Sequence, residues 1–386
     1  MKMRGDAARQ TLGYFGAHVA LGLMSAVLGP TLPALAVQVG STPDALGVLF
    51  AARSLGYLLA SLVIGPVYDR RTAHPVLIVA LLTIAASLAA VPLMPTRAAL
   101  IATLLVMGVA QGVLDVGNNM MLLRVHGPRV APYMNALHCF YGVGALLAPL
   151  CVIATPSLGW GYWSLALAML PVAIHLALAR SPEPVASSHA ELEEHTNASP
   201  RLLWLLVAFF LLGQGAEAGF AGWIYTVALG VGFSDDAAAS LLSSFWAAFT
   251  LGRMLSIAAA AYVRARTMLT VDLLGALASV GVLLLFDGST ALWIGTLALG
   301  LSLASLFPAT MSLAGEHLRL RGAVTSKLFV GASLGSMLMP WGLGYTLTLG
   351  PRGPLWIVLI DLLVAVAVWL AIYRETARDS HLPPTT

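Results

Sequence analysis

The polar residues that could carry chemistry in this sequence lie inside long apolar segments. An ionisable side chain at the centre of a bilayer costs about 2.5–3.5 kcal/mol even on a lenient insertion scale, so its presence there indicates a function. Asp115 is one such residue, with Gln111 four positions before it and Asn118 and Asn119 three and four positions after it. Residues at this spacing share one face of a helix. The stripe predicts a cation-coupling site made of Asp115, Asn118 and Asn119, and it predicts that Gln111 and Asn119 also bind substrate.

The chemistry of this stripe fits two cations. The Asp115 carboxyl group can hold a proton, or its oxygens and those of the asparagines can coordinate a sodium ion. A structural polar cluster inside a helix bundle is the alternative interpretation.

A second polar group lies within the apolar segment 211–229. Glu217 has Gln214 one turn before it, Trp223 follows, and four glycines surround the acid: Gly213, Gly215, Gly219 and Gly222. A carboxylate, an amide and an indole suit a sugar, because hydroxyls bond polar groups while the C–H face of the ring lies on an aromatic surface. We therefore predict that Gln214, Glu217 and Trp223 bind substrate. Helix packing for the glycines and interface anchoring for Trp223 are the alternatives.

A third group contains a histidine. His138 has Asn135 one turn before it and Tyr141 one turn after it, so the three share a helix face. We predict that this face lines a substrate cavity, although a lone buried histidine is more often a satisfied core residue. His18 also lies in an apolar segment but has no such polar neighbours.

Composition places these segments in a membrane. The chain has 386 residues, of which 59% are hydrophobic and 10% are charged, whereas soluble domains are about 25% charged. A soluble enzyme is therefore excluded, and the continuous apolar runs favour helices over barrel strands. The sequence predicts an all-α membrane protein with twelve transmembrane helices, at 11–38, 44–67, 74–93, 96–122, 131–155, 157–179, 201–230, 236–262, 267–286, 289–314, 323–349 and 353–373.

The chain divides into two related halves. The polar stretch 181–200 predicts a cytoplasmic linker between six-helix bundles at 1–180 and 201–386. Segments 55–71 and 251–267 align with one another, as expected for two pseudo-symmetric repeats. The alignment of the halves places Phe307 opposite Asp115, so the second half lacks the acid of the first.

Basic residues set the expected orientation. With the N-terminus inside, the inside loops and tails hold sixteen of the twenty lysines and arginines. The positive-inside rule then predicts that both termini are cytoplasmic. Arg53 and Arg253 lie within spans, where we interpret them as members of ion pairs or as snorkelling side chains.

Several function classes lack their signatures. No phosphate-binding loop and no metal-ligand spacing of histidines and cysteines occurs, so neither ATP nor a metal cofactor is expected. The net charge of +3 is small and dispersed, which argues against a nucleic-acid partner. Cys139 and Cys151 lie twelve residues apart in one predicted helix, about 18 Å along its axis, too far to bond to each other.

The segment GPVYDRR at 65–71 resembles the loop signature of the major facilitator superfamily. Within that superfamily, the segments 112–123, 134–149 and 211–229 resemble the fourth, fifth and seventh spans of the fucose–proton symporter and sodium-dependent glucose transporter group. The resemblance implies that Asp115 is the coupling acid and that His138 stands where the fucose symporter has a sugar-contacting glutamine. It does not extend to a second acid in the first span, because 22–30 contains none.

The sequence therefore predicts a secondary active transporter, not an enzyme, that imports a hexose-like sugar with a cation by alternating access. The proton is preferred and sodium stays open. Proton-coupled export of drugs or other small amphipathic solutes is the rival within transport, and a membrane receptor or scaffold is the rival outside it. We expect a monomer without cofactor in the plasma membrane, or in the inner membrane of a bacterium.

Charged residues at the cytoplasmic helix ends suggest a conformational latch. Asp69, Arg70 and Arg71 follow the second span, and Arg266 occupies the matching end of the eighth span. We expect these charges to pair across the bundle in one conformation and to separate in the other. The alternative is that they only set topology.

Overall fold

The computed structural model describes residues 2–182, 200–318 and 322–379, and every strand-or-helix element in these ranges is a helix. The all-α prediction is thereby confirmed. Most of the predicted linker, 183–199, lies outside the described residues.

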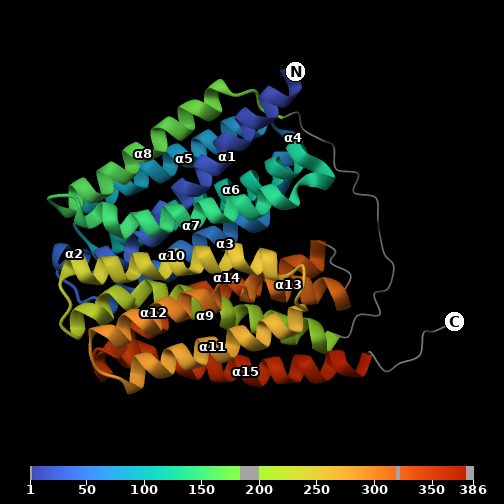
Figure 1. Ribbon diagram of the computed structural model, residues 1–386. Coiled ribbons are helices and arrows are strands. Elements are labelled where there is room, and N and C mark those ends of the chain that lie inside the picture. Colours follow the sequence, from blue (N-terminus) through green and yellow to red (C-terminus); the bar gives the residue numbers. More distant parts are fainter. Residues whose placement is uncertain (1, 183–199, 319–321, 380–386) are drawn as a thin grey trace.

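The helices of the first half form the upper group of Figure 1. They are α1 (Lys2–Ala26), α2 (Leu28–Gln38), α3 (Val48–Val63), α4 (Gly65–Arg70), α5 (Ala73–Ala90), α6 (Arg97–His126), α7 (Ala131–Ile153) and α8 (Leu158–Leu178), with a short 3-10 turn, η1 (Ala45–Gly47), before α3.

The helices of the second half form the lower group. They are α9 (Pro200–Gly230), α10 (Asp235–Ala259), α11 (Ala265–Leu285), α12 (Ser289–Leu303), α13 (Leu306–His317), α14 (Gly322–Tyr345) and α15 (Gly353–Asp379).

The two groups repeat one packing pattern. In the first half α1 packs on α7, α3 on α6, and α5 on α6 and α8; in the second half α9 packs on α14, α10 on α12, and α11 on α12 and α15. The equivalent helices therefore pair in the same way, which confirms two pseudo-symmetric six-helix bundles. The halves meet where α7 packs on α10, α3 on α14, and α2 on α9.

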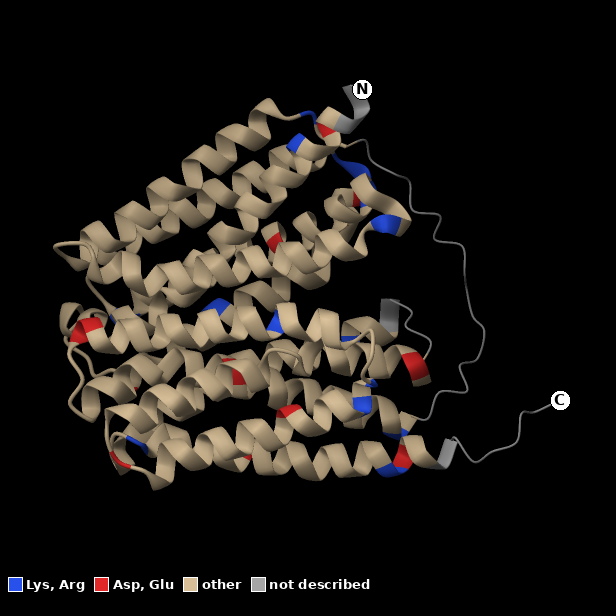
Figure 2. Cartoon of the chain, in the orientation of Figure 1, with Lys and Arg blue, Asp and Glu red and all other residues tan. Residues whose placement is uncertain are grey.

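Ten segments of the described chain are long and apolar enough to cross a membrane, and the bent pair of α1 and α2 makes an eleventh. The remaining predicted span, 323–349, corresponds to α14, which falls outside that set but packs along α9. The start of α1 and the end of α15 lie at the same side of the molecule (Figure 1). Most lysines, arginines and acids lie toward the helix ends, and a few charged residues lie in the middle of the bundle (Figure 2).

Three of the predicted spans are broken, and a proline explains each break. Pro30, Pro66 and Pro308 stand in the first turn of α2, α4 and α13 respectively. A proline lacks the N–H that would bond the carbonyl four residues earlier, yet it is tolerated in a first helical turn. The first span consequently bends by 46° between α1 and α2.

Glycines bring α3 and α6 into unusually close contact. A methyl group on Gly108 would lie 1.9 Å from the carbonyl oxygen of Arg53, and one on Gly56 would lie 2.2 Å from that of Leu105. Such small residues let helix backbones approach within a membrane. This crossing sets Tyr57 of α3 against Asp115 of α6.

We expect Gly108→Ala to destabilise the protein, because backbone atoms of α3 would have to move to admit the methyl group. Overpacking of this kind costs about 1–3 kcal/mol or more. Thermal unfolding of the purified protein measures the effect. Gly281→Ala in α11 is the matched control, since nothing lies within 4 Å of a methyl group there. Equal melting temperatures for the two variants would contradict this account of the crossing.

Candidate functional site

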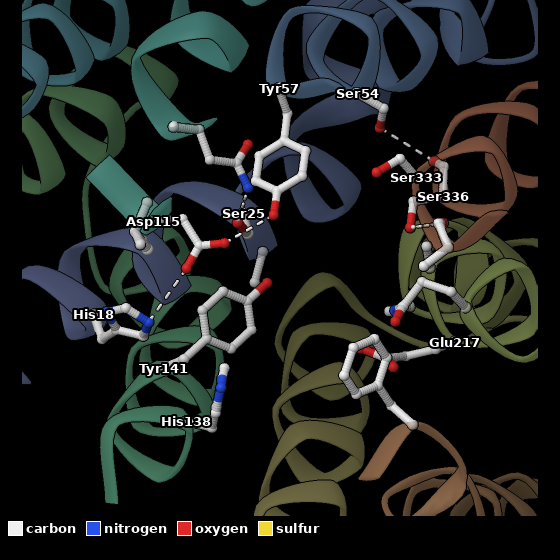
Figure 3. Close-up of a pocket in the computed structure, with 18 of the residues that line it drawn as sticks. His18, Ser25, Ser54, Tyr57, Asp115, His138, Tyr141, Glu217, Ser333 and Ser336 are labelled. Carbon is white, nitrogen blue, oxygen red and sulfur yellow. Dashed lines mark hydrogen bonds and ion pairs between the residues drawn. The ribbon is translucent and has the colours of Figure 1, made fainter. Parts of the chain in front are cut away.

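A cavity of about 600 Å³ lies between the two halves. Its walls come from α1, α3, α6 and α7 on one side and from α9, α10, α13 and α14 on the other (Figure 3). Eight residues predicted for the site line it: Gln111, Asp115, Asn119, Asn135, His138, Tyr141, Gln214 and Glu217.

The Asp115 carboxylate is surrounded by hydrogen-bond donors from three helices (Figure 3). The Tyr57 hydroxyl of α3 donates to Oδ2 at 2.8 Å, and the Asn119 Nδ2 group of α6 donates to Oδ1 at 3.0 Å. Nε2 of His18 in α1 lies 3.4 Å from Oδ1. The Asp115 side chain keeps 27% of its surface exposed, whereas that of His18 is 1% exposed. The Asp115 carboxylate therefore faces the cavity, and the buried His18 ring supports it from the side of α1.

Asn118 does not line the cavity with the rest of the predicted stripe. It is fully buried, and its Nδ2 lies 3.1 Å from Nδ1 of His18. At 3.6 residues per turn, Asn118 points about 60° to one side of Asp115 and Asn119 about 40° to the other. The Asn118 side chain therefore points to α1, where it contacts His18, and the Asn119 side chain points into the cavity.

Trp223 also lies outside the cavity lining, which corrects its placement in the predicted substrate site. Its side chain is 1% exposed, its indole N–H donates to the Pro340 carbonyl oxygen at 2.7 Å, and its ring packs on Phe50 at a centroid distance of 6.0 Å. Six residues of helix turn it about 120° away from Glu217. The indole braces α9 against α14 at one end of the cavity.

The structure adds several residues to the lining that the sequence does not assign to the site. They are Ser25, Tyr57, Trp246, Ser333 and Ser336, together with His18, Arg53 and Arg253, for which the sequence predicts no role in the site. The serines and Tyr57 carry no helical pattern that separates them from packing residues. The depth of Arg53 in its span is a signal for it, but that depth predicts an ion pair or a snorkelling side chain; in the structure its Nη1 donates to the Ser25 carbonyl oxygen at 2.7 Å.

The cavity is closed at the end where α2 meets α9. A methyl group on Gly29 would lie 3.1 Å from the Gly222 carbonyl oxygen, and one on Gly47 would lie 3.2 Å from that of Trp341. At the other end the lining residues Ile257 and Phe329 are 43% and 44% exposed. That open end lies toward the start of α1 and the end of α15, at the starts of α7 and α14 and the end of α10.

Two residues of the predicted latch, Asp69 and Arg266, contact partners within their own halves. Asp69 Oδ1 lies 3.3 Å from Nη2 of Arg124 in α6. The Arg266 guanidinium contacts His317 Nε2 at 3.1 Å and donates to the Thr376 carbonyl oxygen at 3.0 Å. Arg70 and Arg71 are exposed. Among the described residues, these four side chains make no ion pair between the halves in this conformation.

Residues 14–340 match the family model of the Major Facilitator Superfamily. The chain belongs to this superfamily of membrane transport proteins, so it is a multi-pass membrane protein and not an enzyme. The resemblance found in the sequence is thereby confirmed at the level of the superfamily.

Within the superfamily, the chain is similar to curated proteins named sodium-dependent glucose transporters. Sodium-dependent glucose transporter 1 of Rattus norvegicus is 32% identical over 392 residues, covering 87% of this chain and 79% of the relative. Sodium-dependent glucose transporter 1A of Mus musculus is 31% identical over 374 residues, covering 86% of this chain and 88% of the relative. The resemblance to the sodium-dependent glucose transporter group is thereby confirmed.

Solved structures support the fold alone. The nucleoside transporter NupG superposes with a TM-score of 0.76 at 13% identity, covering 95% of this chain and 99% of its own. A bacterial homologue of the human lysosomal transporter Spinster, in an inward-facing and unoccupied conformation, gives a TM-score of 0.73 at 14% identity and covers 99% of both chains.

We expect Trp223→Phe to lower the thermal stability of the protein, because the buried Pro340 carbonyl oxygen loses its donor. Leaving such a group unsatisfied costs about 1–3 kcal/mol. Trp204→Phe in the same helix is the matched control, since Trp204 is 60% exposed on the outer surface. Thermal unfolding followed by size-exclusion chromatography compares them. If Trp204→Phe melts at or below the temperature of Trp223→Phe, the bracing role is wrong.

Proposed function

We propose that this chain is a secondary active transporter that imports a hexose-like sugar together with a cation, and that the cation is a proton. The observation that carries the proposal is the Asp115 carboxylate, held at the wall of a cavity between the two halves by donors from α1, α3 and α6. The printed names of the relatives, sodium-dependent glucose transporters, support sugar as the substrate and coupling to a cation.

The donor set around Asp115 favours the proton over sodium. Hard cations such as sodium take oxygen ligands, as calcium and magnesium do. Here the nearest groups to the carboxylate are a hydroxyl, an amide nitrogen and an imidazole nitrogen, and the Asn118 amide nitrogen is turned to His18. These groups form a hydrogen-bonded network through which a proton is taken up or released, with Asp115 as the coupling residue.

The sugar lies between polar groups of both halves. Gln111, Asn119, Asn135, His138 and Tyr141 face it from the first half, and Gln214 and Glu217 face it from the second. The indole of Trp246 takes the aromatic role that the sequence predicted for Trp223, because it lines the cavity and lies against Tyr141 at a centroid distance of 6.2 Å. Amides, a carboxylate and aromatic faces together match the hydroxyls and C–H faces of a pyranose ring.

Transport follows from rocking of the halves 1–180 and 201–386 about this cavity. The positive-inside rule assigns the open end of the cavity, which lies beside the N- and C-terminal helices, to the cytoplasm of a cell whose plasma membrane holds the monomer. Opening the other end separates α2 from α9 and η1 from α14. The charges at Asp69, Arg70, Arg71 and Arg266 then come into position to pair across the closing cytoplasmic end.

One observation favours the rival function, proton-coupled export of an amphipathic solute. Apolar residues of the second half line the open end of the cavity: Ile257, Phe307, Met311 and Phe329. They could bind the apolar part of such a solute. Thermal stabilisation of the purified protein by hexoses, compared with stabilisation by cationic amphiphiles, separates the two functions.

We expect Asp115→Asn to abolish sugar accumulation driven by a pH gradient in proteoliposomes, because the amide keeps the size of the side chain and removes its charge. Sugar counterflow, which needs no gradient, should persist in part. Asp361→Asn in α15 is the matched control, since Asp361 is a buried acid outside the cavity. Undiminished accumulation by Asp115→Asn would overturn the coupling role.

We expect Glu217→Gln to weaken sugar binding by about tenfold, because a hydrogen bond to a charged acceptor contributes about 1.5–3 kcal/mol and one to a neutral acceptor about 0.5–1.5 kcal/mol. Equilibrium binding of labelled hexose measures the change. Glu316→Gln, at an exposed acid outside the cavity, should bind as the parent does. Equal affinity of Glu217→Gln and the parent would remove Glu217 from the substrate site.

A further inference from the structure

Helix α10 brings two unpartnered N–H groups to the wall of the cavity. Trp246 is 5% exposed, and its Nε1 is buried without a hydrogen-bond partner among the described residues. Nε of Arg253 is likewise buried without a partner. The two residues are seven positions apart, which places them two turns apart on one face of the helix, and both line the cavity. Buried donors are normally satisfied, so this face is incomplete without a ligand.

The charge of Arg253 is also unmatched within the described chain. Its guanidinium lies over the Phe249 ring, 4.7 Å from the centroid, and no described carboxylate lies within ion-pair distance of it. Glu217 influences it only at longer range and is hydrogen-bonded by Gln214. A desolvated charge without a partner is costly. The missing partner of Arg253 is therefore expected to be an anion that enters the cavity.

The other charged groups of the cavity are engaged. Asp115 accepts hydrogen bonds from Tyr57 and Asn119 and contacts His18. The Arg53 guanidinium is turned to the Ser25 carbonyl oxygen. Of the two guanidiniums in the described lining, that of Arg253 is the one without a hydrogen bond to another described residue, so it is free to hold a carboxylate. A phosphate ester carries about −1.5 to −2 at neutral pH and would meet only this one free guanidinium.

We propose that the sugar carried by this site bears a carboxylate, as a hexuronate does. The planar fork of Arg253 holds the two carboxylate oxygens by parallel N–H···O bonds, a geometry for which arginine is suited. The Trp246 indole N–H donates to the same end of the sugar, and the hydroxyls of the ring meet the amides of α6 and α7. This inference rests on the proposed sugar transport and specifies its substrate class.

The experiment compares two ligands that differ in charge and by one methyl group. Glucuronate and its methyl ester otherwise share every ring substituent, so the ratio of their affinities reports on the charged carboxylate. Each competes with labelled glucose for binding to the full-length protein, and each is tested as the internal sugar in counterflow. We expect the uronate to bind about ten- to a hundredfold more tightly than its ester, as the loss of a charge-assisted hydrogen bond implies. Equal binding, or tighter binding of the ester, overturns the proposal.

Variants assign the effect to Arg253. In Arg253→Gln the ratio of uronate to ester affinity should fall to about one, and in Arg253→Lys, which keeps the charge and loses the fork, it should be intermediate. Arg352→Gln is the matched control and should keep the parental ratio, because Arg352 pairs with Asp287 at 2.9 Å outside the cavity. An unchanged ratio in Arg253→Gln overturns the assignment.

The same measurements separate this inference from the proposed function. Glucose binding without a preference for the uronate defeats the carboxylate and leaves sugar transport standing. Absence of binding for glucose, glucuronate and the ester alike defeats both. The comparison of uronate with ester uses the parent protein alone, so it decides the proposal even where a variant does not fold.

Discussion

A carboxylate within the bilayer must be solvated by the protein, and the arrangement around Asp115 follows from that requirement. No single helix can supply the necessary donors, because neighbouring residues of α6 reach only one side of the group. Tyr57 and His18 therefore have to come from α3 and α1. The glycines of the α3–α6 crossing, and Gly22 and Gly144 where α1 crosses α7, permit these helices to approach. The close helix packing of the first half is thus what brings the hydrogen-bond donors of the cavity wall to Asp115.

The second half repeats the packing but not the chemistry. Its helices pair as those of the first half do, yet Phe307 lines the cavity on the side opposite Asp115. Its polar contributions come instead from α9 and α10, through Glu217, Trp246 and Arg253. A duplicated scaffold with unequal walls is consistent with the proposed division, in which the coupling acid belongs to the first half and the substrate contacts come from both halves.

Much of this architecture was readable in the sequence, and the parts that were not have a physical reason. Apolar length predicts spans, and an acid with amides at helical spacing predicts a face, so Asp115, Asn119 and Gln111 were found. The same pattern does not specify which neighbouring helix each side of a wide polar face contacts. The sequence therefore does not predict that Asn118 contacts His18 instead of the cavity. The prediction that Trp223 binds substrate rested on its residue type, which does not specify the direction in which the side chain points from the helix. Arg253 and Trp246 became significant only when the structure showed that their donors have no partners.

The closed end of the cavity is held by contacts that suit a reversible opening. Ser54 Oγ donates to the Ser336 carbonyl oxygen between the halves at 3.2 Å, and the remainder of the contact is made by Phe50, Trp223 and glycine backbones. Each ion pair between described residues lies within one half. A hydrogen bond contributes about 0.5–1.5 kcal/mol, whereas moving an equilibrium from 1:99 to 99:1 takes about 5.5 kcal/mol. A few such contacts bias the two conformations without locking either. Keeping the ion pairs of the described residues inside each half is therefore consistent with the proposed alternating access, in which the halves separate at this end.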